Sequence, residues 1–188
     1  MTGKVIAVTN RKLCTRPFEE QLERAAKAKP YAVILREKDL SEQEYEKLAQ
    51  RALEICEKYH VKCILHTYTD VAKRLKCPYI HLPLWRMEQL EKEEPGWNTF
   101  TEAGASVHSL EEAKKAEELG ASYITAGHIF VTDCKKGLEP RGLEFLKNIC
   151  QEVKIPVFAI GGIHPYNQEE PVNAGAAGVC MMSEFMKI

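Results

Sequence analysis

The sequence predicts a single (β/α)8 barrel, the TIM-barrel architecture, and two observations lead to it. Short apolar runs rich in β-branched residues alternate with longer runs whose apolar residues recur at helical spacing. Eight strand candidates follow one another in this alternation. Apolar strands joined by crossover helices indicate a parallel sheet, and eight units favour closure into a barrel. The alternative is an open doubly wound sheet, but no phosphate-binding glycine fingerprint follows the first strand.

Each element is predicted from its own local pattern. The strands are expected at residues 4–10, 31–36, 62–66, 78–84, 104–109, 121–127, 157–163 and 177–183. The helices are expected at 17–28, 41–60, 69–76, 86–93, 109–120 and 141–153, with 168–175 between the last two strands. Ser41 with Glu44, and Ser109 with Glu112, have the spacing of a helix N-terminal cap.

The sequence stops a few residues after the eighth strand candidate, so we expect a truncated or missing eighth helix. In a barrel this omission would uncover apolar surface on the first and eighth strands. We therefore expect a partner subunit to cover it, in a homodimer or a higher homo-oligomer. No linker or longer repeat interrupts the alternation, and residues 1–188 are expected to form one domain.

Composition narrows the class of protein. Apolar residues make up 45% and charged residues 28%, with 26 basic and 27 acidic side chains, which is ordinary for a soluble globular protein. This balance gives no electrostatic case for nucleic acid or a membrane surface as partner. No apolar stretch reaches the roughly 20 residues that span a bilayer. The amino terminus lacks the layout of a signal peptide. The seven scattered cysteines, without a CxxC pair, fit a reducing cytoplasm and small core positions.

Residues at the carboxyl ends of the strands are the site candidates, because barrels of this class place their chemistry there. Phosphate binding is predicted at Gly161, Gly162, Met182 and Ser183, where backbone N–H groups after the seventh and eighth strands can hold an anion. The alternative is a tight strand-to-helix turn. Arg36 and Lys38 lie one side-chain alternation apart and are predicted to meet a carboxylate or phosphate, unless they are only solvated.

Histidines stand out near several strand ends. His128 follows the sixth strand in a polar loop, and imidazole can both take and give a proton near neutral pH. His81 and His108 lie inside apolar runs and are predicted to be satisfied core histidines. A metal-dependent barrel hydrolase is an alternative, but no HxH or HxxxH pair occurs and Asp70 is the acidic partner that stands out. No metal site is predicted.

Several motifs together resemble the thiamine phosphate synthase and TenI superfamily over residues 4–183. They are VTNRKLC (8–14), LREKDLS (35–41), TDVA (69–72), IHLP (80–83), SVHSLEEA (106–113), AIGGI (159–163) and GVCMMS (178–183). The resemblance implies a (β/α)8 barrel, a role in cytoplasmic thiamine biosynthesis and a thiazole phosphate ligand.

The synthases of this superfamily join a hydroxymethylpyrimidine pyrophosphate to the thiazole phosphate with magnesium. Their pattern includes a glutamine before LREK, an asparagine–aspartate pair after the third strand that contributes a magnesium carboxylate, a glutamine after HLG, and a proline with two threonines in the sixth loop. This sequence has Ile34, His66 with Thr67, Leu84, and then His128, Thr132 and Cys134 at those positions. It keeps Arg36, Lys38, Asp70, Ser106, Thr132 and Lys135.

The sixth loop, GHIFVTDCKKGLEPRG (127–142), is more similar to that of the TenI-type thiazole tautomerases. This similarity implies that His128 is the acid/base residue that aromatises a carboxythiazole phosphate tautomer, with no cofactor. Substrate binding is then expected from Arg36, Lys38, Ser106, Thr132 and Lys135. A thiazole tautomerase, an isomerase, is the expected activity. A magnesium-dependent thiamine phosphate synthase and a non-catalytic thiazole phosphate binder are the alternatives.

Overall fold

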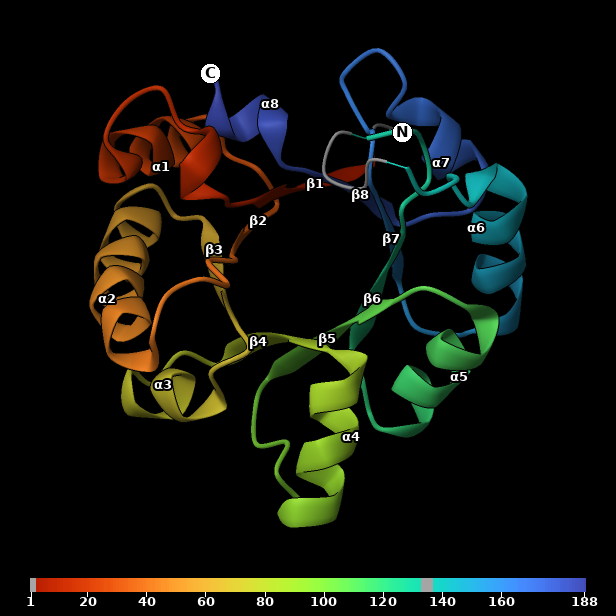
Figure 1. Ribbon diagram of the computed structural model, residues 1–188, viewed down its shortest axis with the longest axis horizontal. Helices are drawn as coiled ribbons and strands as arrows, with labels where there is room; N and C mark the ends of the chain where they lie inside the picture. The colour runs from red at the N-terminus through yellow and green to blue at the C-terminus, as the bar shows by residue number, and fades with distance from the viewer. Residues whose placement is uncertain (1–2, 133–136) are drawn as a thin grey trace. The chain divides into compact units, whose positions relative to one another are not determined.

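The strands form a closed barrel in a computed structural model that describes residues 3–132 and 137–188. They follow one another in sequence order, β1-β2-β3-β4-β5-β6-β7-β8, and neighbours such as β2 and β3 or β6 and β7 pair in parallel (Figure 1). The predicted (β/α)8 barrel is therefore confirmed. The open doubly wound sheet is excluded, because such a sheet has two free edges.

The elements alternate as the sequence predicts. The strands are β1 Lys4–Val8, β2 Ala32–Leu35, β3 Lys62–His66, β4 Tyr79–Pro83, β5 Glu102–Val107, β6 Tyr123–Gly127, β7 Val157–Ile160 and β8 Gly178–Met181. The helices are α1 Phe18–Lys27, α2 Glu42–Lys58, α3 Thr69–Arg74, α4 Leu84–Glu93, α5 Leu110–Glu118, α6 Gly142–Glu152, α7 Glu169–Asn173 and α8 Ser183–Met186, and a 3-10 turn, η1, covers Arg11–Leu13. None of the described helices is both long and apolar enough to cross a membrane.

The contacts divide the chain into two compact units, which are described separately below. The Val5–Ile80 unit also contains Met181–Ile188. The His81–Cys180 unit also contains the residues that precede Val5. The expectation that residues 1–188 behave as one domain stays a prediction.

In the Val5–Ile80 unit, α2 buries one face that repeats at helical spacing. Tyr45, Ala49, Ala52 and Cys56 are the buried residues of this helix. The predicted cap is present, because the Ser41 backbone N–H donates to Glu44 Oε2 at 2.9 Å and the Ser41 side chain accepts from the Glu44 backbone. This capping box fixes where α2 begins after β2.

In the His81–Cys180 unit, β5 and β6 alternate between two faces. Gly104 pairs with Tyr123 and Ser106 pairs with Thr125, so these four residues share one face of the sheet. The intervening Ala105 and Ile124 are fully buried on the other face. One face of the strand pair is thus apolar, and the other carries polar side chains.

The eighth helix is truncated, as expected. Helix α8 has four residues and lies beside α1, where Gln21 Nε2 donates to the Phe185 carbonyl at 2.7 Å (Figure 1). The expected uncovered surface is wrong, because Ile6 to Val8 of β1 and Val179 to Met181 of β8 are buried. The homo-oligomer stays a prediction, without this surface to support it.

The described cysteines are free thiols, and most lie in the core. Cys56, Cys63, Cys77 and Cys180 are buried, whereas Cys14 and Cys150 are half-buried. Burial raises the pKa of Cys77 and of Cys180 above the ordinary value of a thiol. These two side chains therefore stay protonated and behave as small core residues, as the sequence predicts.

Candidate functional site

Four polar side chains meet inside the His81–Cys180 unit, in what we call the polar column: His81, Ser106, Tyr123 and Thr125. His81 Nε2 lies 2.8 Å from Ser106 Oγ, and His81 Nδ1 lies 3.0 Å from the Tyr123 hydroxyl. Thr125 Oγ1 lies 3.3 Å from Ser106 Oγ and 3.4 Å from His81 Nε2. His81, Thr125 and Tyr123 are 2%, 3% and 5% exposed, whereas Ser106 is half-buried. Ser106 is therefore the member of the column that reaches solvent.

Local sequence choices make room for this column. A Cβ atom at position 104 would collide with the Tyr123 ring, so the glycine in β5 allows the tyrosine to pack directly against that strand. The Tyr123 ring also meets Phe158 of β7 edge to face, with centroids 5.7 Å apart. The tyrosine is thus fixed from two sides, and its hydroxyl is aimed at His81.

His128 opens the loop after β6 and is 8% exposed. Its Nε2 lies 3.3 Å from the Leu138 carbonyl, which can only accept, so this nitrogen is the donor. The His128 carbonyl accepts the Arg141 N–H at 2.9 Å, which joins the two arms of the loop. The structure thus places the predicted acid/base residue in a buried contact with its own loop.

Gly161 and Gly162 follow β7 with positive φ angles of +100° and +65°. A Cβ atom on Gly161 would collide with His128, and one on Gly162 would collide with the Val131 carbonyl. The loop after β6 therefore requires both glycines, because its backbone packs directly on them. The Ile129 and Phe130 N–H groups donate to the carbonyls of Ile160 and Gly161, both at 3.0 Å. The phosphate-binding role of the two glycines stays a prediction.

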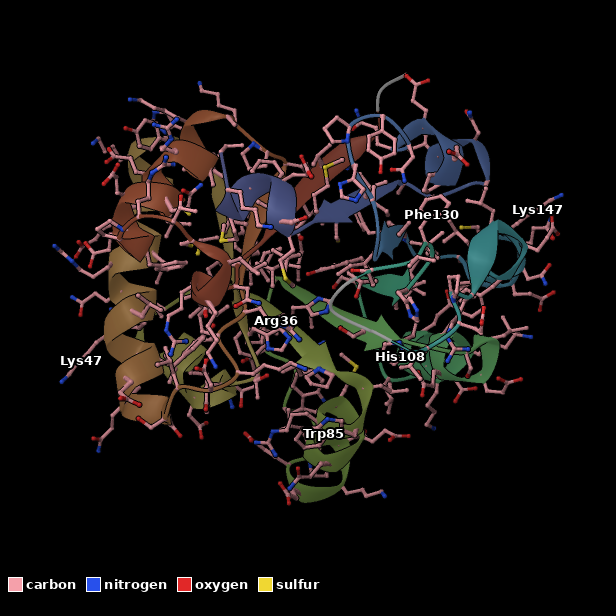
Figure 2. The ribbon with its side chains drawn as sticks, turned by 45° about the horizontal axis from the view of Figure 1, so that its top comes forward. Arg36, Lys47, Trp85, His108, Phe130 and Lys147 are labelled. Carbon is pink, nitrogen blue, oxygen red and sulfur yellow. The ribbon has the colours of Figure 1, made fainter. Side chains whose placement is uncertain are left out.

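His108, labelled in Figure 2, follows β5 and is exposed, so its predicted place in the core is wrong. Its Nδ1 lies 2.9 Å from the Gly127 carbonyl, the residue before His128. Strand β5 ends at Val107, two residues before the end of the strand expected at 104–109. His81, by contrast, is buried with both ring nitrogens in hydrogen bonds, as predicted.

In the Val5–Ile80 unit, a buried carboxylate organises the loop that carries Arg36 and Lys38. Glu37 is 3% exposed and accepts from the Thr9 hydroxyl at 2.7 Å and from the Arg11 N–H at 3.0 and 3.1 Å. The Arg36 N–H donates to the same Thr9 hydroxyl at 2.9 Å. We call Thr9, Arg11 and Glu37 the Glu37 clasp. It joins the end of β1 to the end of β2.

Arg36 is half-buried and Lys38 is exposed, on either side of Glu37 in the sequence. The Arg11 guanidinium extends the clasp to Asp39 with two hydrogen bonds of 2.6 and 2.9 Å. These hydrogen bonds lower the pKa of Asp39, so its carboxyl group is charged over the physiological range. The loop that presents Arg36 and Lys38 is therefore held by charge-assisted hydrogen bonds.

The end of β3 carries His66 and Thr67. His66 is 4% exposed, and its Nδ1 lies 2.6 Å from Thr67 Oγ1. Thr67 has a φ of +68°, a left-handed conformation that β-branched residues rarely adopt. The His66 N–H donates to the Tyr45 hydroxyl of α2 at 2.7 Å. At the end of β3, Thr67 thus has a strained backbone, and its hydroxyl is hydrogen-bonded to His66.

The remaining predicted residues are placed as follows. Thr132 is half-buried in the His81–Cys180 unit. Met182 and Ser183 are half-buried at the start of α8 in the Val5–Ile80 unit, where Asn10 Nδ2 lies 3.8 Å from Met182 Sδ. Lys135 lies outside the described residues. Of the predicted site residues in the His81–Cys180 unit, His128 and Gly161 lie against each other. Phosphate binding by Met182 and Ser183 stays a prediction.

Sequence reasoning missed Tyr123, Thr125 and Glu37. The first two lie within an apolar run, and a signal was present, because they alternate on one face at positions 123 and 125. Glu37 could have been found by the side-chain alternation that grouped Arg36 with Lys38, because the residue between these two must face the opposite side of the strand. A charged residue there requires a buried partner, which is Thr9 with the Arg11 backbone.

A closed parallel barrel with polar side chains at the strand ends is the framework of the (β/α)8-barrel enzymes. Within that class, residues 5–185 match the family model described as thiamine monophosphate synthase. The chain belongs to this family, which confirms the resemblance based on its motifs.

Individual relatives agree with the family. A thiamine-phosphate synthase from Fusobacterium nucleatum is 36% identical over 97% of this chain and 89% of its own length. A putative thiamine-phosphate synthase 2 from Aquifex aeolicus is 34% identical over 98% of both chains. Among solved structures, thiamine phosphate pyrophosphorylase from Pyrococcus furiosus has a TM-score of 0.81 and 31% identity, over 96% of this chain and 85% of that one.

These relatives correct the predicted activity. The expected thiazole tautomerase, and with it the isomerase class, is wrong, because relatives that are similar over nearly the whole chain are thiamine-phosphate synthases. The expectation rested on the segment 127–142, part of which lies outside the described residues, and on the synthase positions that hold other residues here, such as Ile34 and Leu84. Similarity of the whole barrel outweighs similarity of one loop.

Proposed function

We propose that this protein is a transferase of the thiamine-phosphate synthase type. It would join hydroxymethylpyrimidine pyrophosphate to a thiazole phosphate. The observation that carries the proposal is the 36% identity to a thiamine-phosphate synthase over 97% of this chain. The cytoplasmic location and the homo-oligomer belong to this proposal as predictions.

The reaction makes defined demands on the protein. A carbon–nitrogen bond forms between the pyrimidine methylene carbon and the thiazole nitrogen, and the carbon–oxygen bond to pyrophosphate breaks. Pyrophosphate leaves with the electron pair, so negative charge grows on its bridging oxygen. Cations and hydroxyl donors stabilise such a leaving group. The substrate-binding prediction for Arg36, Lys38, Ser106 and Thr132 fits this demand, and Lys135 is kept with them as a sequence-based prediction.

Arg36 and Lys38 suit an anionic group because their loop is held in one shape. The Glu37 clasp ties this loop to β1 through Thr9 and the Arg11 backbone. A loop that is ordered before binding loses less conformational entropy when the anion arrives. This support is local to the Val5–Ile80 unit and does not depend on the other unit.

Magnesium is the cofactor that the synthase family implies, and family membership is consistent with it. The residues at the end of β3 do not fit the ion. Magnesium prefers carboxylate oxygens and water, whereas this position has His66 and Thr67, whose side chains hydrogen-bond each other. Across residues 3–132 and 137–188, no group of three or more His, Cys, Asp or Glu side chains could hold a metal ion. We therefore assign no step of the reaction to magnesium.

The test is a coupling assay with both substrates, run in parallel with magnesium and with a chelator. We expect thiamine phosphate and pyrophosphate to appear in equal amounts. Ser106→Ala should lower turnover by roughly 10- to 100-fold, the effect of losing a hydrogen bond to a charged group. Ser122→Ala is the matched control, because Ser122 precedes β6 at its amino end. No product from folded protein under either condition would exclude the proposal, and thiazole phosphate binding alone would then indicate a binding protein.

A further inference from the structure

The polar column runs from a buried phenol, through a buried imidazole, to a half-buried hydroxyl. Tyr123 is 5% exposed, His81 is 2% exposed, and Ser106 is the end that reaches solvent. The imidazole bridges them, with Nδ1 at 3.0 Å from the tyrosine hydroxyl and Nε2 at 2.8 Å from the serine hydroxyl. A barrel interior is usually filled by apolar side chains, and burying polar groups there costs free energy unless each is satisfied. Each member of the column has a hydrogen-bond partner, so this cost is offset and the four side chains form one connected network.

The tautomer of His81 decides what Ser106 can offer a ligand. In the neutral ring one nitrogen donates and the other accepts. If Nε2 carries the proton, it donates to Ser106 Oγ, and the serine proton is free to point outward. If Nδ1 carries the proton, Nε2 accepts, and Ser106 at 2.8 Å is a closer donor to it than Thr125 at 3.4 Å; a Ser106 that donates inward can only accept from a ligand. Ser106 is thus a hydrogen-bond donor to a ligand in one tautomer of His81 and an acceptor in the other.

Two contacts favour the Nε2–H tautomer. The tyrosine phenol is more acidic than an aliphatic alcohol, so it is the better donor to the imidazole, and it faces Nδ1. On the other side, Nε2 faces two hydroxyl oxygens, Ser106 Oγ at 2.8 Å and Thr125 Oγ1 at 3.4 Å. Both can accept from Nε2–H and still keep their own protons. Thr125 then donates to Ser106 at 3.3 Å, and the Ser106 proton alone is left for a ligand.

We infer that His81 is a positioning residue, held as the Nε2–H tautomer by Tyr123, which makes Ser106 a hydrogen-bond donor to a phosphate or pyrophosphate oxygen. Donors in one direction along a chain of hydrogen bonds polarise one another and strengthen the last of them. The inference rests on the proposed function for the identity of the anion. The tautomer of His81 is inferred from its hydrogen-bond partners alone and does not depend on the proposed function.

A spectroscopic measurement tests the ring directly. In uniformly ¹⁵N-labelled protein, long-range ¹H–¹⁵N spectra separate the two neutral tautomers and the doubly protonated ring. The chain has six histidines, so the His81 signals are assigned by their loss in His81→Asn, or by elimination with variants of the other five if that variant does not fold. We expect the Nε2–H form. The Nδ1–H form or a doubly protonated ring would overturn the inference.

A double-mutant cycle tests whether Tyr123 acts through Ser106. Inorganic pyrophosphate is the probe, and its dissociation constant is measured by calorimetry. Tyr123→Phe should weaken binding by roughly 3- to 10-fold, the usual effect of one hydrogen bond. The same substitution should have no effect in a Ser106→Ala background, because the group through which it acts is gone. Tyr31→Phe, before β2 at its amino end, is the matched control and should bind like the wild type.

The outcomes separate the inference from the proposed function. A merely structural Tyr123 would weaken binding equally in both backgrounds and leave the tautomer unchanged, which would overturn the inference even if the coupling assay succeeds. If the wild-type protein does not bind pyrophosphate, the proposed function and the donor role of Ser106 both fail. The tautomer measurement then still decides whether Tyr123 sets the state of His81.

Discussion

The backbone N–H of His66 donates to the hydroxyl of Tyr45 at 2.7 Å, and that hydroxyl donates to the Leu35 carbonyl, also at 2.7 Å. One side chain of α2 therefore joins the carboxyl ends of β2 and β3. Tyr45 is 1% exposed, so water does not replace either contact.

Tyr45→Phe should lower the free energy of unfolding by about 1–3 kcal/mol, because it leaves a buried N–H and a buried carbonyl without this partner. Chemical denaturation measures the change. Tyr59→Phe is the control, since its hydroxyl donates to Glu23 near the surface at 2.6 Å. A loss at Tyr45 no larger than that at Tyr59 would contradict the bridging role.

The same residue predicts how stability depends on alkaline pH. Burial raises the pKa of Tyr45 well above the ordinary value of about 10. The folded state therefore holds the proton more tightly than the unfolded state does. The stability contribution is complete below about pH 10 and is lost as pH rises above that value. Unfolding titrations from pH 8 to 11 should show a steeper alkaline loss for the wild type than for Tyr45→Phe, and equal slopes would contradict this account.

Glu37→Gln should weaken the clasp that holds the Arg36 loop. The amide keeps one acceptor but loses the charge that Thr9 and Arg11 contact, and we expect a loss of about 1.5–3 kcal/mol in unfolding free energy. Asp39→Asn is the matched control, because Asp39 is exposed and pairs with the same arginine. Denaturation measures both variants. In the coupling assay, Glu37→Gln should also raise KM more than Asp39→Asn does.

Thr67→Asp should restore a carboxylate at the end of β3, whereas Thr67→Asn adds no charge. Both residues tolerate the left-handed conformation at φ +68° better than threonine does, so both should raise the melting temperature without metal. Only Thr67→Asp should show an additional rise on adding magnesium. Thermal melts with and without magnesium measure this, and an equal magnesium response in the wild type would contradict the conclusion that His66 and Thr67 do not fit the ion.

Gly162→Ala should destabilise the protein more than Gly96→Ala. Both glycines have positive φ angles, +65° and +82°, so both substitutions carry a conformational cost of about 1 kcal/mol. A Cβ atom at position 162 also collides with the Val131 carbonyl, whereas a Cβ atom at position 96 has no atom of the described residues within 4 Å. Denaturation of the two variants separates the collision from the conformational cost. Similar losses would mean that the loop after β6 moves away easily.

The barrel could be predicted from the sequence because each element carries its own signal. Apolar runs mark the strands, and Ser41 with Glu44 marks the start of α2, without knowledge of any neighbour. The exposure of His108 could not be predicted in this way. It depends on where β5 ends, because the strand expected to reach residue 109 stops at Val107 and His108 follows it, exposed to solvent.

The candidate site brings together residues that are far apart in the sequence. The polar column joins positions 81, 106, 123 and 125 through hydrogen bonds that no local pattern shows. The double glycine illustrates the same limit. Gly161 and Gly162 are consistent with an approaching phosphate, but what approaches them in the structure is the backbone of the loop after β6.

That packing restricts how the protein can be redesigned. Because the backbone after β6 rests on Gly161 and Gly162, the two connections behave as one exchangeable module. If residues 128–142 were transplanted from a relative into an otherwise unchanged host, the new backbone would pack on residues 161 and 162 of a protein with which it did not evolve. New specificity should therefore be grafted with both segments from the same donor, and recombination between relatives should succeed more often when the crossover points leave them together.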